Sequence, residues 1–266
     1  MNGEAVVRLS LFLGVFSVLA ISEVLWPFRP TAVRAERWPA NLGLSVLNTI
    51  VVRVLIGLVP GFAIAAAAAV GKETGLLAFT GLHGAAVAVT GFVVLDLAVY
   101  LQHIAFHHIP VFWRLHRVHH ADRQFDVTTA IRFHPLEIVI SQLWKIAVVV
   151  VLGVPVVSVF AFEVVLNAGA MFSHSNLRLP GWIDRQLRVL LVTPDMHRIH
   201  HSVLLPEINS NYGFNFSFWD RAFGTYRDRS QSDQLTMDLG LPGYQTSPTS
   251  RIGWLLVFPF LRGRSL

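Results

Sequence analysis

The sequence contains no cysteine among its 266 residues. Disulfides, iron–sulfur clusters, thiolate zinc sites and cysteine nucleophiles are therefore excluded. Charge is also scarce, because 14% of the residues are charged, against about one-quarter in an average soluble domain. With 53% hydrophobic residues and a mean hydropathy of +0.55, the composition argues against a water-soluble enzyme and against a disordered chain.

Lysine occurs only twice, and the arginines that make the net charge +5 are scattered along the chain. This pattern is a poor match to a nucleic-acid-binding surface. It is typical of a membrane protein with arginines on its cytoplasmic side.

Three apolar runs, residues 10–26, 42–70 and 75–101, are each long enough to cross a hydrocarbon core of about 30 Å as a helix. The first run follows no basic segment and precedes no small-residue cleavage site, so we expect a retained helix and not a signal peptide. The shorter runs 138–152 and 156–172 predict a helical hairpin, and the sequence leaves open whether it spans fully. Residues 252–261 are too few to span, and we expect them to lie in the membrane interface.

Orientation follows from the basic residues that flank these runs. The segment around Lys72 and Glu73 is nearly neutral, whereas the segments on the opposite side are rich in arginine. The positive-inside rule then places the arginine-rich side, and with it residues 174–230, in the cytoplasm. The arginines concerned are Arg29, Arg34, Arg37, Arg114, Arg117, Arg123 and Arg132.

Eleven of the twelve histidines fall between His103 and His201. The pattern H-x-x-H-H occurs twice in this window, and a third pair is spaced by four residues. On a helix, positions i, i+3 and i+4 share one face, so each group directs its imidazoles one way. So many imidazoles in a mostly apolar chain would pack poorly without a cation, and the pattern therefore predicts metal ligation.

Ten histidines form the expected ligand set, which is too many for one zinc ion with about four ligands. Two ions with five imidazoles each would keep one open position apiece, which suits oxygen binding. We therefore expect two iron ions, although zinc could occupy the site in purified samples. His108 is a lesser alternative to His107. The expected ligands are His103, His107, His116, His119, His120, His134, His174, His197, His200 and His201.

Three polar residues are candidates to support the ligands from behind: Asp96, Asn176 and Asp195. Asp96 lies seven residues before His103 and so shares its helix face. Asp195 and the further candidate Glu137 could equally serve helix-end electrostatics.

The ordered motifs resemble the fatty acid hydroxylase/sterol desaturase superfamily. They run H-x-x-x-H, H-x-x-H-H, H-P-L-E, H-S-N, H-x-x-H-H, N-Y-G and W-D-x-x-F-G-T over residues 92–228. The resemblance implies an integral membrane non-haem di-iron oxygenase, an all-α, multi-pass transmembrane bundle with a cytoplasmic helical cap that holds the histidines. It implies that O₂ and externally supplied electrons hydroxylate or desaturate a lipid, such as a sterol or a fatty acyl chain.

Three regions follow from this reading: transmembrane helices over residues 1–91, a catalytic region over 92–228, and a tail with an interfacial segment over 229–266. No fused haem-binding domain is evident, so we expect a separate electron donor, a ferredoxin or a b-type cytochrome with its reductase. Two alternatives are a zinc-dependent membrane hydrolase and a metal transporter or metal-storage protein. The absence of H-E-x-x-H weighs against the first, and the position of the histidines after the spans weighs against the second.

Overall fold

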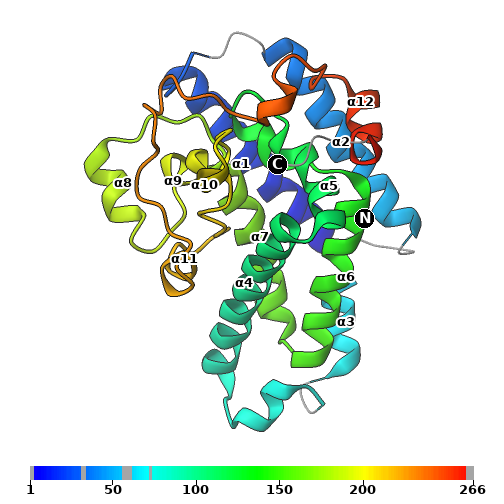
Figure 1. Ribbon diagram of the computed structural model, residues 1–266. Helices are drawn as coiled ribbons and strands as arrows, with labels where there is room; N and C mark the ends of the chain where they lie inside the picture. Colours follow the sequence, from blue (N-terminus) through cyan, green and yellow to red (C-terminus); the bar gives the residue numbers. More distant parts are fainter. Residues whose placement is uncertain (1–2, 31–33, 56–61, 72–73, 262–266) are drawn as a thin grey trace.

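The computed structural model describes residues 3–30, 34–55, 62–71 and 74–261. Within these ranges the chain consists of helices, turns and three isolated β-bridges, so the predicted all-α class is confirmed. Figure 1 shows a narrow lower part made mainly of long helices, and a broader upper part in which two further long helices, coloured blue, run among short helices and loops.

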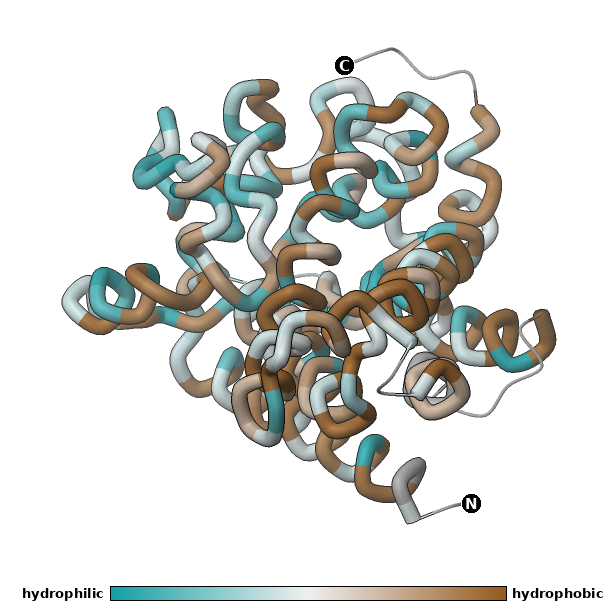
Figure 2. Tube along the Cα trace, turned by 90° about the horizontal axis from the view of Figure 1, so that it is seen from below, coloured by the Kyte–Doolittle hydropathy of each residue, from teal (hydrophilic) through white to brown (hydrophobic). Residues whose placement is uncertain are grey.

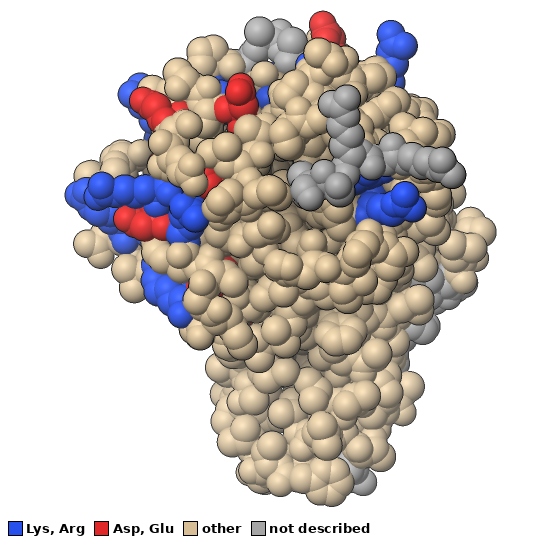
Figure 3. All heavy atoms as spheres, viewed as in Figure 1, with Lys and Arg blue, Asp and Glu red and all other residues tan. Residues whose placement is uncertain are grey.

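Five helices are long and apolar enough to cross a membrane, as expected for a multi-pass protein. They are α1 (Gly3–Leu25), α2 (Arg34–Leu55), α4 (Gly84–His108), α6 (Pro135–Leu152) and α7 (Val156–Ser173). Among them are both members of the predicted hairpin. Figure 3 shows the narrow lower part free of charged side chains on the visible face, with the blue and red residues on the broad upper part.

Two of the expected spans differ in detail from the structure. The run over residues 42–70 is divided between α2 and the short helix α3 (Phe62–Val70), and both pack against α6. The run over residues 75–101 begins with a 3-10 helix, η1 (Leu76–Thr80), so the long helix starts only at Gly84. Lys72 and Glu73 lie outside the described residues.

The α6–α7 hairpin forms the centre of the bundle, and its turn is tight. Gly153 ends α6 with a φ of 66°, a left-handed conformation that glycine adopts without strain. A Cβ atom on the neighbouring Gly75 would lie only 2.2 Å from the Gly153 nitrogen, so the two backbones approach directly. Around this turn a core cluster buries Leu95, Val149, Val154, Val159 and Phe162.

Nine short helices of the described structure, with the loops between them, form what is here called the cap. Figure 2, which is seen from below, shows brown predominating in the part nearest the viewer and most of the teal in the upper part of the view. The short helices of the cap are α5 (Pro110–His120), η2 (Val127–Ile131), α8 (Gly181–Leu187), α9 (Pro194–His200), α10 (Leu205–Ile208), α11 (Phe218–Ala222), η3 (Pro242–Tyr244), α12 (Ile252–Val257) and η4 (Phe258–Phe260). The upper end of α4 reaches into the cap as well.

Buried arginines join the cap to the membrane helices. Arg37 of α2 forms ion pairs with Asp122 at 2.6 Å and with Asp126 at 2.7 Å. Arg132 is fully buried and donates to the Val118 carbonyl, the Asn41 side chain and the Thr249 carbonyl. Each charge is paired or hydrogen-bonded, which is the condition for its burial.

The last helices pack onto this frame through one face. Leu255 and Phe258 are buried, and Arg117 donates to the carbonyls of Phe258 and Leu261. Val257 and Phe260 are exposed on the other face. This one-sided burial agrees with an interfacial segment, which stays a prediction.

Candidate metal centre

The first ligand helices are α4 and α5, which meet at a sharp turn. Ile109 has extended backbone, and Pro110 occupies the first position of α5, where its missing N–H costs nothing. His103 and His107 therefore lie on the last turns of α4, and the first triplet lies on α5. All five imidazoles are buried.

The second triplet lies at the end of α9, whose start is fixed by a capping threonine. Thr193 is the N-cap and its hydroxyl accepts a hydrogen bond from the Met196 N–H, with Pro194 following. His197 and His200 lie on the helix, and His201 is its C-cap. His174, which ends α7, approaches the same place from the membrane side.

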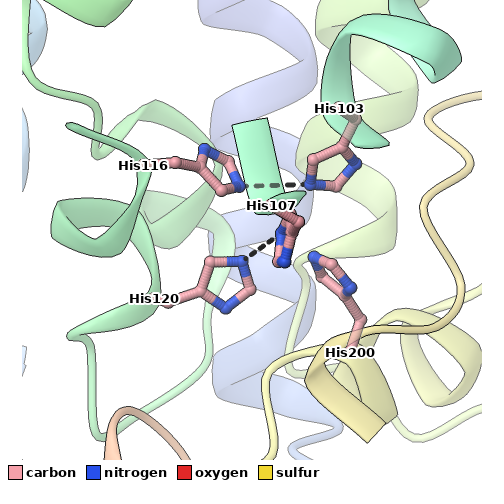
Figure 4. A group of neighbouring side chains, drawn as sticks. All are labelled: His103, His107, His116, His120 and His200. Carbon is pink, nitrogen blue, oxygen red and sulfur yellow. Dashed lines mark hydrogen bonds between the residues drawn. The ribbon is translucent and has the colours of Figure 1, made fainter. Parts of the chain in front are cut away.

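Nine imidazoles form two adjoining groups. In each group the candidate ligand atoms all lie within 4.8 Å of one another. Figure 4 shows the first group, in which side chains from α4, α5 and α9 converge on one point. The first group contains His103, His107, His116, His120 and His200, and the second contains His119, His174, His197 and His201.

The two groups share a boundary. The rings of His120 and His201 stack with centroids 4.5 Å apart, and those of His119 and His116 lie 5.2 Å apart. Because adjacent residues of each triplet serve different groups, two ions held here would be close neighbours.

The distances between nitrogens fit bound cations. The Nε2 atoms of His103 and His116 are 3.1 Å apart, as are those of His107 and His120. In the second group the Nε2 of His174 lies 3.1 Å from that of His119 and 3.0 Å from that of His197. Two imidazole nitrogens bound at right angles to one ion, at about 2.1 Å each, are separated by about 3 Å.

Several buried ring nitrogens also have no hydrogen-bond partner among the described residues. Both nitrogens of His201 and the Nε2 of His200 are examples. A buried polar atom without a partner costs free energy, and a cation would remove that cost. The residues present therefore fit a metal centre.

The imidazoles are uncharged near neutral pH. Burial lowers the pKa of His116 to about 3 and that of His174 to about 4. Burial, followed by repulsion from neighbouring imidazoles, lowers the pKa of His119, His197 and His201 well below the ordinary value. Neutral imidazoles keep the lone pair that a metal ion needs.

Acceptors behind the rings fix which nitrogen faces the centre. The Nδ1 of His103 donates to the Tyr212 carbonyl and that of His200 to the Ser210 carbonyl, both at 2.7 Å. The Nδ1 of His116 lies 2.6 Å from a carboxylate oxygen of Glu137. In each case Nε2 is left to bind the ion, which is the usual support for a ligating histidine.

The N-Y-G and W-D-x-x-F-G-T motifs act together to place one of these carbonyls. The Asp220 carboxylate accepts from the N–H groups of Tyr212 and Gly213 and from the Thr225 hydroxyl. Asn211 precedes them with a φ of 54°, which asparagine tolerates better than most residues. The sequence contained this motif, but residue type alone did not show that its carbonyl supports His103.

His134 lies outside both groups. It is the N-cap of α6: its Nδ1 accepts from the Leu136 N–H, and its Nε2 lies 3.2 Å from the Leu256 carbonyl. Both nitrogens are thus engaged by backbone, so the structure brings nine of the ten expected ligands together. His107 belongs to the first group, whereas the exposed His108 contacts the Tyr212 hydroxyl.

None of the three expected supporting residues contacts a grouped imidazole by a hydrogen bond in the described structure. Asp96 accepts from Asn215 and Trp219, and Asp195 pairs with Arg198. The Asn176 side chain bonds the backbone of Arg29. Of the residues considered, Glu137 holds the supporting position.

Fold and site together define a helical membrane protein with two adjoining histidine groups suited to bind metal ions. The family model for fatty acid hydroxylases matches residues 88–225, which include all nine grouped histidines. The chain belongs to this family, as the motifs predicted.

Curated relatives share this region. The chain is 31% identical over 160 residues to ornithine lipid hydroxylase OlsE of Rhizobium tropici, covering 58% of this chain and 45% of the relative. It is 28% identical over 149 residues to human alkylglycerol monooxygenase, covering 53% and 31%. It is 27% identical over 162 residues to fatty acid hydroxylase vlmA of a Lecanicillium species, covering 56% and 44%. The chain thus spans less than half the length of these relatives, and no solved structure matches it.

Proposed function

We propose that this protein is a membrane-bound, O₂-dependent oxygenase that holds two iron ions and hydroxylates a lipid. One observation carries the proposal: nine buried imidazoles converge in two adjoining groups at the cap-side ends of membrane helices. Membership of the fatty acid hydroxylase family supports it.

Bound iron would supply the oxidation of an unactivated C–H bond, a reaction beyond the reach of amino-acid side chains alone. The protein's own residues would hold the ions, orient the imidazole rings and exclude water. The nine imidazoles would hold the ions, and Glu137 and the carbonyls of Ser210 and Tyr212 orient three of the rings. Because every grouped imidazole is buried, the centre is shielded from bulk water.

Hydroxylation is the preferred reaction, because the relatives are named hydroxylases and a monooxygenase. Desaturation begins with the same hydrogen abstraction and is the second outcome that product analysis would distinguish. The substrate is a membrane lipid, since the centre lies at the ends of helices that cross the bilayer.

Electrons come from a separate donor, a ferredoxin or a b-type cytochrome with its reductase. We place the cap in the cytoplasm, where such donors are found. The support is that the seven arginines named from the sequence flank the cap-side ends of the spans.

The zinc-hydrolase alternative is less well supported. In the part of the chain that the structure describes, Glu137 is the one carboxylate bonded to a grouped imidazole, and it binds the Nδ1 side of His116. It therefore lies behind a ligand and not where a general base would activate water. The transporter alternative is disfavoured because the histidines of both groups are buried at the cap-side ends of the spans and do not line a path through the membrane.

The test combines metal content with lipid profiling. Anaerobic loading with Fe²⁺ should give about two irons per chain, and cells that express the protein should contain a lipid heavier by one oxygen. His119→Ala and His200→Ala should each remove that product while membrane insertion survives. His83→Ala is the control, because His83 is exposed at the start of α4, far from the groups.

One metal or none per chain would refute the dinuclear centre. Full turnover in both histidine variants would refute its catalytic role. A product lighter by two hydrogens would replace hydroxylation by desaturation.

A further inference from the structure

Part of the cap lies beside a membrane helix and not above it. The Phe216 ring packs against Phe92 of α4 with centroids 6.1 Å apart. Trp219 of α11 donates through its indole N–H to Asp96 at 2.9 Å. Phe92 is sixteen residues before the end of α4, which corresponds to about 24 Å along the axis at about 1.5 Å per residue.

The same segment returns upward along α4. The Tyr100 hydroxyl lies 2.7 Å from the Thr225 hydroxyl, and the Tyr100 ring packs against Phe223 at 5.4 Å. Tyr100 is eight residues before the end of α4, or about 12 Å along it. Residues 216–225 therefore run level with the stretch of α4 between Phe92 and Tyr100, which is within a span expected to cross a bilayer.

The end of α8 is joined to this segment. The Ser217 N–H donates to the Leu190 carbonyl, and Leu191 forms a β-bridge with Phe216. The Arg221 guanidinium donates to the Arg188 carbonyl at 2.8 Å. We name residues 181–190 and 216–224 together the α8–α11 lobe, which Figure 1 shows at the left side of the molecule, with α11 level with the upper part of α4 and α8 above it.

The outer surface of the lobe is apolar. Trp182, Val189, Leu190 and Phe223 are between 52% and 66% exposed. Water would make this exposure costly, because about 25 cal/mol is lost for each Å² of apolar surface left uncovered. The neighbouring helix α4 also exposes an apolar side chain, since Val89 is 63% exposed.

Arginines surround these apolar residues. Arg185 and Arg221 are exposed on α8 and α11, and Arg229 follows with a side chain that is 91% exposed. Figure 3 shows the blue residues gathered over this side of the cap. An apolar surface bordered by arginine and tryptophan matches the boundary between acyl chains and lipid phosphates.

We propose that the α8–α11 lobe is inserted into the cap-side leaflet of the bilayer, with Leu190 and Phe223 in contact with acyl chains. Arg185 lies at the level of the headgroups and Trp182 at the boundary, Arg229 faces water, and the Arg221 guanidinium is held by the Arg188 carbonyl within the lobe. The occupant of this surface is lipid and not a second protein, because residues 216–225 lie alongside the part of α4 that is expected to cross the bilayer, and Val89, about one turn from Phe92, is exposed there.

The natural absence of cysteine makes the test direct. Leu190→Cys and Phe223→Cys are prepared singly and reconstituted in vesicles of phosphatidylcholine and phosphatidylglycerol. Val89→Cys serves as the membrane control and Arg229→Cys as the water control. A charged, water-soluble maleimide should label positions 190 and 223 at least about tenfold more slowly than position 229 and about as slowly as position 89. All four should label equally in denaturing detergent.

A second measurement identifies what covers the surface. A bimane probe attached in detergent at position 190 or 223 should be quenched by phosphatidylcholine with a doxyl group on its acyl chain, to the extent seen at position 89. Labelling as fast as at position 229 would overturn the proposal. Slow labelling without doxyl quenching would also overturn it, because a protein and not lipid would then cover the lobe.

Discussion

Single hydrogen bonds decide how the histidines are used. His116 and His134 are both buried, and both lie near the start of α6, yet their neighbours give them different roles. The Nδ1 of His116 meets the Glu137 carboxylate and leaves Nε2 for an ion, whereas the Nδ1 of His134 caps the helix. A carboxylate behind a ligating imidazole raises its basicity and fixes its orientation.

At this scale we predict that Glu137→Ala weakens iron binding by about 10- to 100-fold, the usual effect of losing such a partner. The measurement is iron retained against a graded series of chelator concentrations. His134→Asn is the matched comparison at the same helix start, because asparagine is also a good N-cap, and it should keep its iron. Loss of iron from His134→Asn would return His134 to the ligand set, and unchanged retention in Glu137→Ala would refute the supporting role.

At the scale of elements, short motifs position the ligands through the backbone. The turn Asn211–Gly213 is held by Asp220 and delivers the Tyr212 carbonyl to His103. A Cβ atom on Gly213 would lie 2.7 Å from the Phe216 carbonyl oxygen and 2.9 Å from the Asp220 carboxylate. A side chain at position 213 would therefore disturb the turn that holds the Tyr212 carbonyl against His103.

Gly213→Ala should destabilise the cap by about 1–3 kcal/mol, the usual range for overpacking, and should lower iron content in parallel. Thermal unfolding and metal analysis of the same preparation provide the measurement. Gly181→Ala is the control, since a Cβ atom there meets nothing within 4 Å. Equal behaviour of the two variants would show that the turn does not position the ligand.

Local spacing predicts much of the centre, because helix geometry converts H-x-x-H-H directly into a shared face. It did not distinguish His134 as a cap, although Pro135 directly after it is typical of the first position of a helix. Asp96 was expected below His103, but contacts with Asn215 and Trp219, more than a hundred residues later, direct it elsewhere. Long-range partners such as Arg37 and Asp122 leave no local pattern, so the sequence could not reveal them.

At the scale of the whole molecule, the metal centre joins the membrane helices to the cap. The nine grouped imidazoles come from α4, α5, α9 and the end of α7, and their partnerless buried nitrogens cost free energy until an ion binds. An ion that binds the folded chain and not the unfolded chain stabilises the fold in proportion to the logarithm of its concentration. Iron should therefore be a structural element as well as a catalytic one.

Removal of iron with a chelator should lower the midpoint of thermal unfolding by at least about 5 °C, from about 3 kcal/mol per tightly bound ion. Addition of Fe²⁺ without oxygen should restore it. The same treatment of His200→Ala, which lacks one ligand of the first group, should give a smaller shift. An unfolding midpoint that does not respond to chelation in the unsubstituted protein would contradict this coupling.

The positions of the nine ligands along the chain also set an order for biogenesis. The earliest two ligands end the helix α4, but His197, His200 and His201 follow the last span, α7. Neither group is complete until every transmembrane segment has been synthesised and the ribosome has passed residue 201. Under the proposed function, all five candidate spans are therefore made before either iron site is complete, and a chain that stalls before α9 would have no complete centre to load.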